Sequence, residues 1–329
     1  MTKKKQLKWI LLCATILTLG ACSSDSELQE QAYTEVELRL SSSLDQRTRA
    51  AYTKTQDTQI LSGENVYAWV DEAKSDGAIE YIQAWQLTAD GSGNFSATQK
   101  TYPISGNPVN VYAVHGNFST APSGSFPTAA LSHHVNVAQN TSAGYAASDL
   151  LYAIGTNLAR QTAAHQLTFR HLLSKIEVYL VAGIGTTDAE LASAQVTIMN
   201  TKPTAMVTLS KTAAPTFALS GTTVDISAKM QSQTDQTITI GSDTSVPVYG
   251  FAEAIIVPQW VNTTGDSDGS DVDFIKVTLG TMNYAAQVNE HFEAGHRYKY
   301  NVIVNKSGIE LTSTISQWND GGITDTTAQ

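Results

Sequence analysis

The chain has 329 residues with only two cysteines, and its formal net charge at pH 7 is −10. An acidic chain repels phosphate backbones, so the charge argues against nucleic-acid binding and against adhesion to anionic membranes by charge alone. Two cysteines cannot build a disulfide framework, so stability must come from a large apolar core. A chain of this length forms such a core as about two domains.

Residues 1–21 have the three parts of a secretory signal peptide. A head with four lysines precedes an apolar stretch over residues 9–19, which is shorter than the ~20 residues of a transmembrane helix. The segment ends in Leu-Gly-Ala, directly before Cys22. This ending resembles the bacterial lipobox, which implies that the Cys22 sulfur is acylated and held in membrane lipid. An ordinary cleaved signal followed by a chance cysteine is the alternative.

Loss of the signal peptide changes both the charge and the chemistry of the mature chain. Four of the 20 Lys and Arg residues leave with the signal, so 16 remain against 30 Asp and Glu residues, and the net charge becomes −14. Cys13 leaves with the signal and lipid consumes Cys22. No thiol then remains for a disulfide, a metal site or a nucleophile.

Residues 22–49 are predicted to be a tether that leads into one strand. Ser23–Gln31 is polar and acidic, which resembles the surface-export signal of Bacteroidetes lipoproteins and equally suits a solvated linker. Tyr33–Leu40 alternates in polarity, and one face of it carries Val36, Leu38 and Leu40. That period predicts a half-buried strand.

The next stretch, Ser41–Ala51, is polar and lacks apolar periodicity. It predicts an exposed loop of the kind that proteases cut. Arg47 and Arg49 lie in it, with Ala50 directly after the second arginine. Two solvated loop residues are the alternative interpretation of these arginines.

From Ile60 onward, short β-rich runs alternate with turn clusters, which predicts an all-β chain of two β-sandwiches. The predicted strands are Val66–Val70, Tyr81–Leu87, Val109–Val114, Leu151–Ile154, Leu167–Phe169, Ile176–Val181, Val196–Met199, Met206–Leu209, Ala254–Val257, Phe274–Leu279, Tyr298–Val304 and Ile309–Ile315. Residues 187–194 are expected to form one short helix. We place an N-terminal sandwich over residues 50–164 and a C-terminal sandwich over residues 165–329.

The histidines and acidic residues do not form a recognisable metal motif. His133 and His134 are adjacent, so in a strand they point to opposite faces. His291 and His296 span a turn and do not have the helical spacing of a zinc motif. The acidic run over residues 266–273 could hold calcium, although it lacks the register of an EF-hand. A solvated hairpin tip is the alternative for that run.

Catalytic motifs are also missing from the sequence. No Gly-x-Ser-x-Gly elbow and no glycine-rich phosphate loop is present. Trp69 and Trp85 could stack on sugar rings, but tryptophans in strands more often belong to the core. We therefore expect no catalytic residue, no metal and no cofactor, and a protein that is not an enzyme.

Five sequence runs resemble the fimbrillin family of Bacteroidales. They are DLLYA at 149–153, LTFRHLLSKIEV at 167–178, IIVPQ at 255–259, FEAGHRYKY at 292–300 and ISQW at 315–318. The resemblance implies two transthyretin-like β-sandwiches in tandem. It also implies a subunit of a surface fimbria that reaches the outer membrane as a lipoprotein and supports adhesion.

The same resemblance implies assembly by strand exchange. A cut after an arginine, here Arg49 or secondarily Arg47, would release the first strand and open an apolar groove. A C-terminal strand of another copy or a related subunit would fill that groove, and the candidate donor here carries Ile309, Leu311 and Ile315. The polar tail after Trp318 departs from a deep apolar donor, so stalk, tip and anchor subunits remain open.

Two other functions stay open at this point. An uncleaved anchor or accessory lipoprotein, or one that binds glycans or another surface ligand, would keep its lipid at Cys22. A surface hydrolase with a β-sandwich fold would need a cleft with two converging carboxylates.

Overall fold

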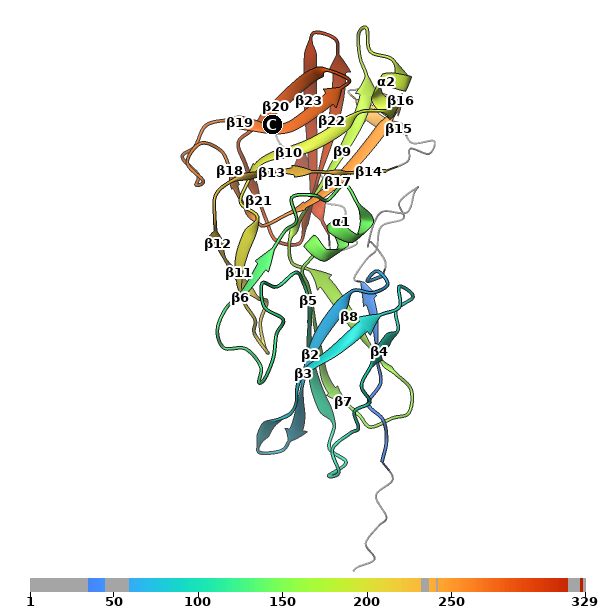
Figure 1. The fold of residues 1–329 in the computed structure, drawn as a ribbon, viewed down its shortest axis with the longest axis vertical. Coiled ribbons are helices and arrows are strands. Elements are labelled where there is room, and N and C mark those ends of the chain that lie inside the picture. Colours follow the sequence, from blue (N-terminus) through green and yellow to red (C-terminus); the bar gives the residue numbers. More distant parts are fainter. Residues whose placement is uncertain (1–34, 45–58, 232–236, 241, 319–325, 328–329) are drawn as a thin grey trace, which may run out of the picture. The chain divides into compact units, whose positions relative to one another are not determined.

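The computed structural model describes residues 35–44, 59–231, 237–240, 242–318 and 326–327 (Figure 1). The signal peptide, Cys22, the tether and the predicted cleavage residues Arg47, Arg49 and Ala50 lie outside these residues. Across the described part, two short helices accompany a fold made of strands, which confirms the all-β prediction. Over the same residues, no helix is long and apolar enough to cross a membrane.

The N-terminal half of the chain forms a seven-stranded sheet (Figure 1). In order across the sheet, its strands are β1 (Leu40–Leu44), β8 (His165–His171), β7 (Leu151–Leu158), β5 (Val109–His115), β2 (Asn65–Lys74), β3 (Gly77–Ala89) and β4 (Phe95–Ala97). β1 runs parallel to β8, whereas all other neighbours are antiparallel. The central strands β2 and β5 are rich in Val, Tyr and Trp, which suit a strand that is buried on both faces.

A six-stranded sheet dominates the C-terminal half. In order, its strands are β14 (Lys229–Gln231), β17 (Gly250–Ile256), β9 (Ser174–Ala182), β22 (His296–Asn305), β23 (Gly308–Gln317) and β24 (Thr326–Thr327). β9 is buried along almost its whole length on both faces. β23 pairs with β22 over ten residues, but on its other side only two residues pair with β24.

Four smaller sheets complete the described strands. One contains β13 (Val224–Ser227), β10 (Gln195–Thr201), β19 (Val272–Leu279) and β20 (Met282–Val288). A second contains β12 (Thr216–Ser220), β11 (Thr204–Thr208) and β6 (Leu131–His134). The two-stranded sheets pair β15 (Thr237–Ile240) with β16 (Asp243–Pro247), and β18 (Gln259–Val261) with β21 (Glu290–Phe292).

Both helices are short, and a threonine caps the N-terminus of each. α2 (Asp188–Ala192) lies within the predicted helix at 187–194, and Thr187 and Glu190 form a capping box at its start. α1 (Ser142–Ser148) was not predicted; the Thr141 side chain caps it by accepting a hydrogen bond from Gly144 N. Side-chain oxygens of this kind satisfy backbone N–H groups that the first helical turn leaves unpaired.

The cores do not follow the predicted boundary between residues 164 and 165. β8 begins at His165 but pairs with β1 and β7, and its Leu167 and Phe169 belong to the core of the seven-stranded sheet. The largest core contains C-terminal strands together with Trp69 and Tyr112 from the N-terminal half. The division into two tandem transthyretin-like domains at 164/165 therefore stays a prediction.

The first strand departs from its prediction at both limits. A strand was expected at Tyr33–Leu40 and a loop from Ser41, whereas β1 spans Leu40–Leu44. The serine run was misread because its polarity hides a continuing alternation of burial. Ser42 is small enough to lie inside, and its hydroxyl donates to Gly93 O at 3.4 Å.

Candidate assembly site

Residues 36–44 enter the N-terminal core with every second side chain. Leu38, Leu40 and Leu44 are 1%, 6% and 7% exposed, and Ser42 is 3% exposed. Val36 is half-buried and packs against the same core. Full burial of a leucine side chain stabilises a fold by about 1.5–3 kcal/mol. This one short segment therefore contributes several kcal/mol to the N-terminal core.

Both edges of the segment are hydrogen-bonded to backbone. On one edge, Leu38 N donates to Lys100 O at 2.8 Å and Ser42 N donates to Gly93 O at 2.7 Å. On the other edge, β1 pairs with β8 residue by residue, so that Ser42 lies beside Leu167. The segment thus closes the N-terminal sheet on itself. Without it, the edge of β8 and the edge near β4 would both be unpaired.

A surface recess of about 480 Å³ lies beside this segment, which forms one of its walls. Its lining joins the first strand to β3, to the stretch around β4 and to the loop before β8. The lining residues are Glu37, Leu38, Arg39, Leu40, Trp85, Leu87, Asn94, Phe95, Ser96, Ala97, Thr98, Gln99, Thr162, Ala163 and Ala164.

Trp85 is 6% exposed and Trp69 is fully buried. The prediction that these two tryptophans belong to the core is confirmed.

The candidate donor strand, β23, lies near the edge of its own sheet. Ile309, Leu311 and Ile315 are each only partly buried, and they cover the largest core beside β22. The opposite residues on β22, which include Tyr298 and Val304, are almost fully buried. β23 therefore covers a core from its rim and contributes less burial per side chain than β1 does.

Trp318, the residue after β23, is inserted into the protein interior. It is 4% exposed and stacks on His171, with ring centroids 3.6 Å apart and ring planes 11° apart. Its backbone N–H donates to Gly295 O at 2.6 Å. Lys175 lies on the adjoining strand β9, and its Nζ atom is 5.5 Å from the indole centroid. The end of β23 is thereby fixed to β8, β9 and the turn before β22.

Buried polar and charged side chains are joined to this indole through His171 and Lys175. Lys175 Nζ lies 3.1 Å from Glu253 Oε2 and 3.8 Å from Glu177 Oε1. Asp149 Oδ2 lies 2.9 Å from His171 Nδ1. All of these side chains are buried. Isolated charges are costly in such surroundings, so the cluster persists because each member faces an opposite charge or another polar partner.

The histidines occupy separate places. His133 and His134 point to opposite sides of β6, as predicted. His133 is fully buried, whereas the ring of His134 forms hydrogen bonds with the hydroxyl groups of Ser132, Ser119 and Thr204. The ring of His133 accepts from Asn117 N and lies 3.0 Å from Ser148 O. Burial lowers the pKa of His133 to about 3. It is therefore neutral at physiological pH.

The second histidine pair and the acidic loop make their contacts with residues close by in the sequence. His291 and His296 lie 4.0 Å and 3.5 Å from the two carboxylate oxygens of Glu293. In the acidic loop, Asp266 accepts from the Thr264 hydroxyl and from Asp268 N, and these hydrogen bonds lower its pKa. Within the described ranges, no group of three His, Cys, Asp or Glu side chains could hold a metal ion.

Residues 48–318 match the model of the fimbrillin-like family, which covers most of the chain. The chain belongs to the fimbrillin-like family. This confirms the resemblance that the five sequence runs indicated. Membership also confirms the prediction that the chain is not an enzyme.

One relative and two solved structures similar to this fimbrillin-like chain come from Bacteroides species. It is 27% identical over 330 residues to Fim1C of Bacteroides uniformis, named as a proposed fimbrium subunit, and the match covers 97% of this chain and 96% of the relative. Two crystal structures of proposed cell adhesion proteins have the same fold. The protein from B. uniformis aligns with a TM-score of 0.55 at 19% identity, covering 86% of this chain and 98% of its own. The protein from B. ovatus aligns with a TM-score of 0.57 at 16% identity, covering 87% and 98%.

Four of the five family runs contribute residues to the cluster around Trp318 in the fimbrillin-like fold. Asp149 belongs to the first run, His171 and Lys175 to the second, Gly295 to the fourth and Trp318 to the last. Sequence reasoning used these runs only as markers and missed that they form one buried cluster. The clustering of His171, Lys175 and a terminal tryptophan in such runs was the available signal, but their pairing depends on sheet order.

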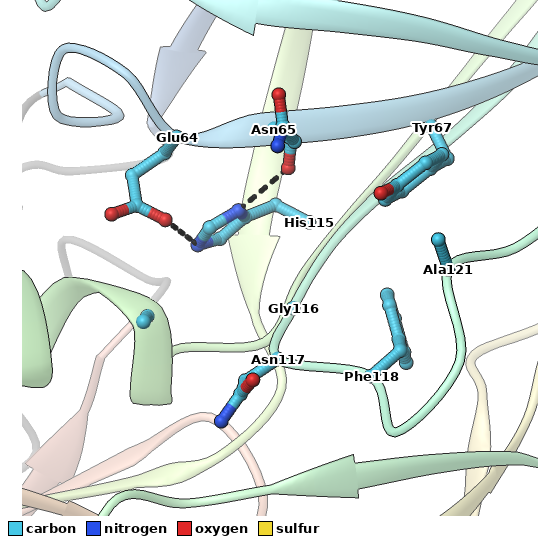
Figure 2. A pocket seen from close by; sticks show the side chains of 9 residues that line it. Glu64, Asn65, Tyr67, His115, Gly116, Asn117, Phe118 and Ala121 are labelled. Carbon is cyan, nitrogen blue, oxygen red and sulfur yellow. Dashed lines mark hydrogen bonds and ion pairs between the residues drawn. The ribbon is translucent and has the colours of Figure 1, made fainter.

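A second recess of about 230 Å³ lies beside the start of β2 in this fimbrillin-like chain (Figure 2). In it, His115 Nδ1 lies 2.9 Å from Asn65 O, and Nε2 lies 3.2 Å from Ala146 O and 4.0 Å from a Glu64 carboxylate oxygen. Figure 2 shows the ring lying between β2 and the end of β5. Because both ring nitrogens contact neighbouring strand or helix groups, the ring joins β5 to β2 and α1.

Proposed function

We propose that this chain is a subunit of a cell-surface fimbria that polymerises by strand exchange. Export as a lipoprotein through Cys22 would deliver it to the outer membrane. A cut after Arg49 would then release residues 22–49 together with the lipid. Its partners would be other copies of the same chain or related fimbrial subunits. Family membership supports the fimbrial role, and the packing of the first strand supports the exchange.

The observation that carries the exchange is the position of residues 36–44. They supply buried leucines to a core and hydrogen bonds to two sheet edges, yet they join the rest of the chain only through residues 45–58. A cut in that connection would leave the segment held by noncovalent contacts alone. Its loss would expose apolar surface and two strand edges, and such edges recruit another strand.

The donor in this proposal is the C-terminal strand with Ile309, Leu311 and Ile315. It is the second strand from the edge of its sheet, and its outer edge pairs with β24 over only two residues. Adding it to another copy would restore the lost ladder and refill the core. The chain would then be held on the surface by its neighbours, whereas an uncut chain would remain held by its lipid.

The test compares cells that make the natural chain with cells that make Arg49→Ala, Arg47→Ala or Arg39→Ala. Surface material is sequenced from its N-terminus and is viewed by electron microscopy. We expect natural chains to begin at Ala50 and to form filaments, and we expect Arg49→Ala to abolish both. Arg39→Ala changes an exposed residue of the released segment and should change neither.

An intact chain that begins at Cys22 would refute the polymer and would favour the uncleaved anchor or accessory lipoprotein. Filaments that persist in Arg49→Ala but vanish in Arg47→Ala would move the cut to the earlier arginine. In that case the released segment still includes β1, because β1 ends at Leu44.

A further inference from the structure

The segment that leaves the groove and the strand proposed to enter it share one pattern of residues. Residues 38–44 read LRLSSSL and residues 309–315 read IELTSTI. In both, three aliphatic residues and one serine alternate with polar residues, and the serine occupies the same place. Resting on the proposed function, we infer that β23 of a second copy fills the groove in one register, with Ser313 at the place of Ser42.

The place of Ser42 is buried and holds a small side chain. Ser42 is 3% exposed, and its backbone N–H donates to Gly93 O at 2.7 Å. Gly93 is itself buried, and a Cβ atom added to it would lie 2.9 Å from Ser42 O. The two backbones therefore approach closely here. The neighbouring places, occupied by Leu40 and Leu44, are instead lined by the apolar core.

This small place selects the register. A shift of two residues in either direction puts Leu311 or Ile315 at the buried place of Ser42 and puts Ser313 at the place of Leu44 or Leu40. A shift of one residue turns the whole apolar face outward. Only the register with Ser313 at that place fills all three leucine positions with aliphatic side chains.

The pattern also selects the direction of the donor. Residues 38–44 lie parallel to β8 and antiparallel to the stretch around Asn94 on their other edge. Read backwards, the strand either puts Leu311 at the place of Ser42 or, with Ser313 kept there, puts Gln317 at the place of Leu38. The donor strand must therefore enter parallel to β8, in the same direction as the strand that it replaces.

The vacated place buries the three aliphatic side chains of the donor more completely than their own sheet does. In its own chain, β23 lies near the edge of the sheet with Ile309, Leu311 and Ile315 only partly covered. The corresponding places in the groove leave their leucines at most 7% exposed. Removal of apolar area from water is the main favourable term in association. The place of half-buried Val36 is not matched, so the inferred register spans seven residues.

A cysteine pair tests the register in filaments on the cell surface. Ser41 bridges Asn94 across the groove, and the inferred register puts Thr312 at the place of Ser41. Chains that carry Thr312→Cys and Asn94→Cys should form a ladder of covalent multimers under oxidation. The natural cysteines, Cys13 and Cys22, both precede Arg49 and are absent from the cut chain. Ser41→Cys with Asn94→Cys in an uncut Arg49→Ala chain is the positive control for geometry.

The controls for register are Glu310→Cys and Thr314→Cys, each with Asn94→Cys. They lie two residues away on the same face and should give little cross-linking. A ladder from either of these pairs, and not from Thr312→Cys, would overturn the register. Filaments without a ladder from any pair would overturn β23 as the donor while leaving a polymer intact. Loss of N-terminal processing at Arg49 would instead count against the proposed function itself.

Side-chain size supplies a second test. Ser313→Leu should reduce filament yield, because overpacking of this kind weakens binding roughly ten- to hundredfold. Ser313→Ala should preserve the yield. Circular dichroism of each uncut chain checks that the variant folds. If Ser313→Leu folds and assembles as well as Ser313→Ala does, the small place does not set the register and the inference is wrong.

Discussion

The indole of Trp318 stacks on the imidazole of His171 at a centroid distance of 3.6 Å, which fixes the end of β23 to β8. Trp318→Ala should lower the free energy of unfolding by about 3–5 kcal/mol, the usual cost of removing a buried aromatic side chain. Trp260→Ala is the matched control, because Trp260 also stacks on a histidine, His291, but is only half-buried. Urea unfolding measures both. Equal losses in the free energy of unfolding would show that the buried stack stabilises the fold no more than the half-buried one does.

The Lys175–Glu253 pair should show strong coupling. Lys175→Met removes the cation that faces Glu253, and Glu253→Gln removes the nearer of the two carboxylates that face Lys175, so each should cost about 3–5 kcal/mol. The double variant should cost much less than the sum of the two single variants. A double-mutant cycle by chemical denaturation measures the difference. Additive losses would contradict a direct interaction between the two side chains.

His133 predicts a dependence of stability on pH. Its folded pKa is lowered to about 3, below the usual value of 6.5, so the unfolded chain binds more protons between these values. The stability that His133 contributes is thus complete above about pH 6.5 and is lost as pH falls toward 3. The slope for one proton is about 1.4 kcal/mol per pH unit.

The measurement for His133 is urea unfolding between pH 4.5 and 7, compared with His133→Gln. In the His133→Gln variant, the free energy of unfolding should depend less on pH, with a slope smaller by up to about 1.4 kcal/mol per pH unit. His134→Gln is the control, because His134 lies on the other side of β6 and is only half-buried. A variant at His133 with an unchanged slope would show that another group titrates in this range.

The first strand should stabilise the uncut chain through its inward side chains alone. Leu38→Ala is expected to cost about 2–5 kcal/mol, because Leu38 is 1% exposed and leaves a cavity. Arg39→Ala, on the outward face, should change stability by less than about 0.5 kcal/mol. Thermal or urea unfolding of the uncut chain tests this. Similar effects at both positions would mean that the segment does not hold the core as described.

The close approach at Gly93 predicts a further difference. Gly93 and Gly106 both have positive φ, +93° and +77°, so alanine strains the backbone at either position. Only at Gly93 would the new Cβ atom meet a backbone oxygen, Ser42 O at 2.9 Å. Gly93→Ala should therefore destabilise the uncut chain by about 1–3 kcal/mol more than Gly106→Ala does. Equal losses would show that the backbones of Gly93 and Ser42 do not approach as closely as described.

Strand positions were predictable where alternation was unbroken. Val109–Val114, Ile176–Val181 and Tyr298–Val304 were each expected as strands and lie within β5, β9 and β22. Apolar and β-branched residues dominate these segments, so local preference and burial agree. The prediction lost accuracy where a strand carries polar residues inward, as at Ser42, because sequence polarity does not reveal a hydroxyl that bonds to backbone.

The cluster around Trp318 could not be assembled from sequence. Asp149 and Trp318 are far apart along the chain, yet each contacts His171, and this arrangement depends on the order of strands β8, β9 and β22. The spacing of two residues along the sequence predicts whether they are neighbours on one strand or helix, whereas contacts between strands depend on the topology of the sheet. Helix α1 was missed for another reason: it has only seven residues, too few for an apolar period to repeat, and its signal was the cap at Thr141.

Because the groove beside β8 and strand β23 belong to different sheets of one chain, a polymer joined through them has two unlike ends. At one end a chain keeps a groove that no neighbour has filled, and at the other a chain keeps a strand that no neighbour has received. Addition of a subunit is then a different reaction at each end. A molecule that offers only a strand would stop one end, and a molecule that offers only a groove would stop the other.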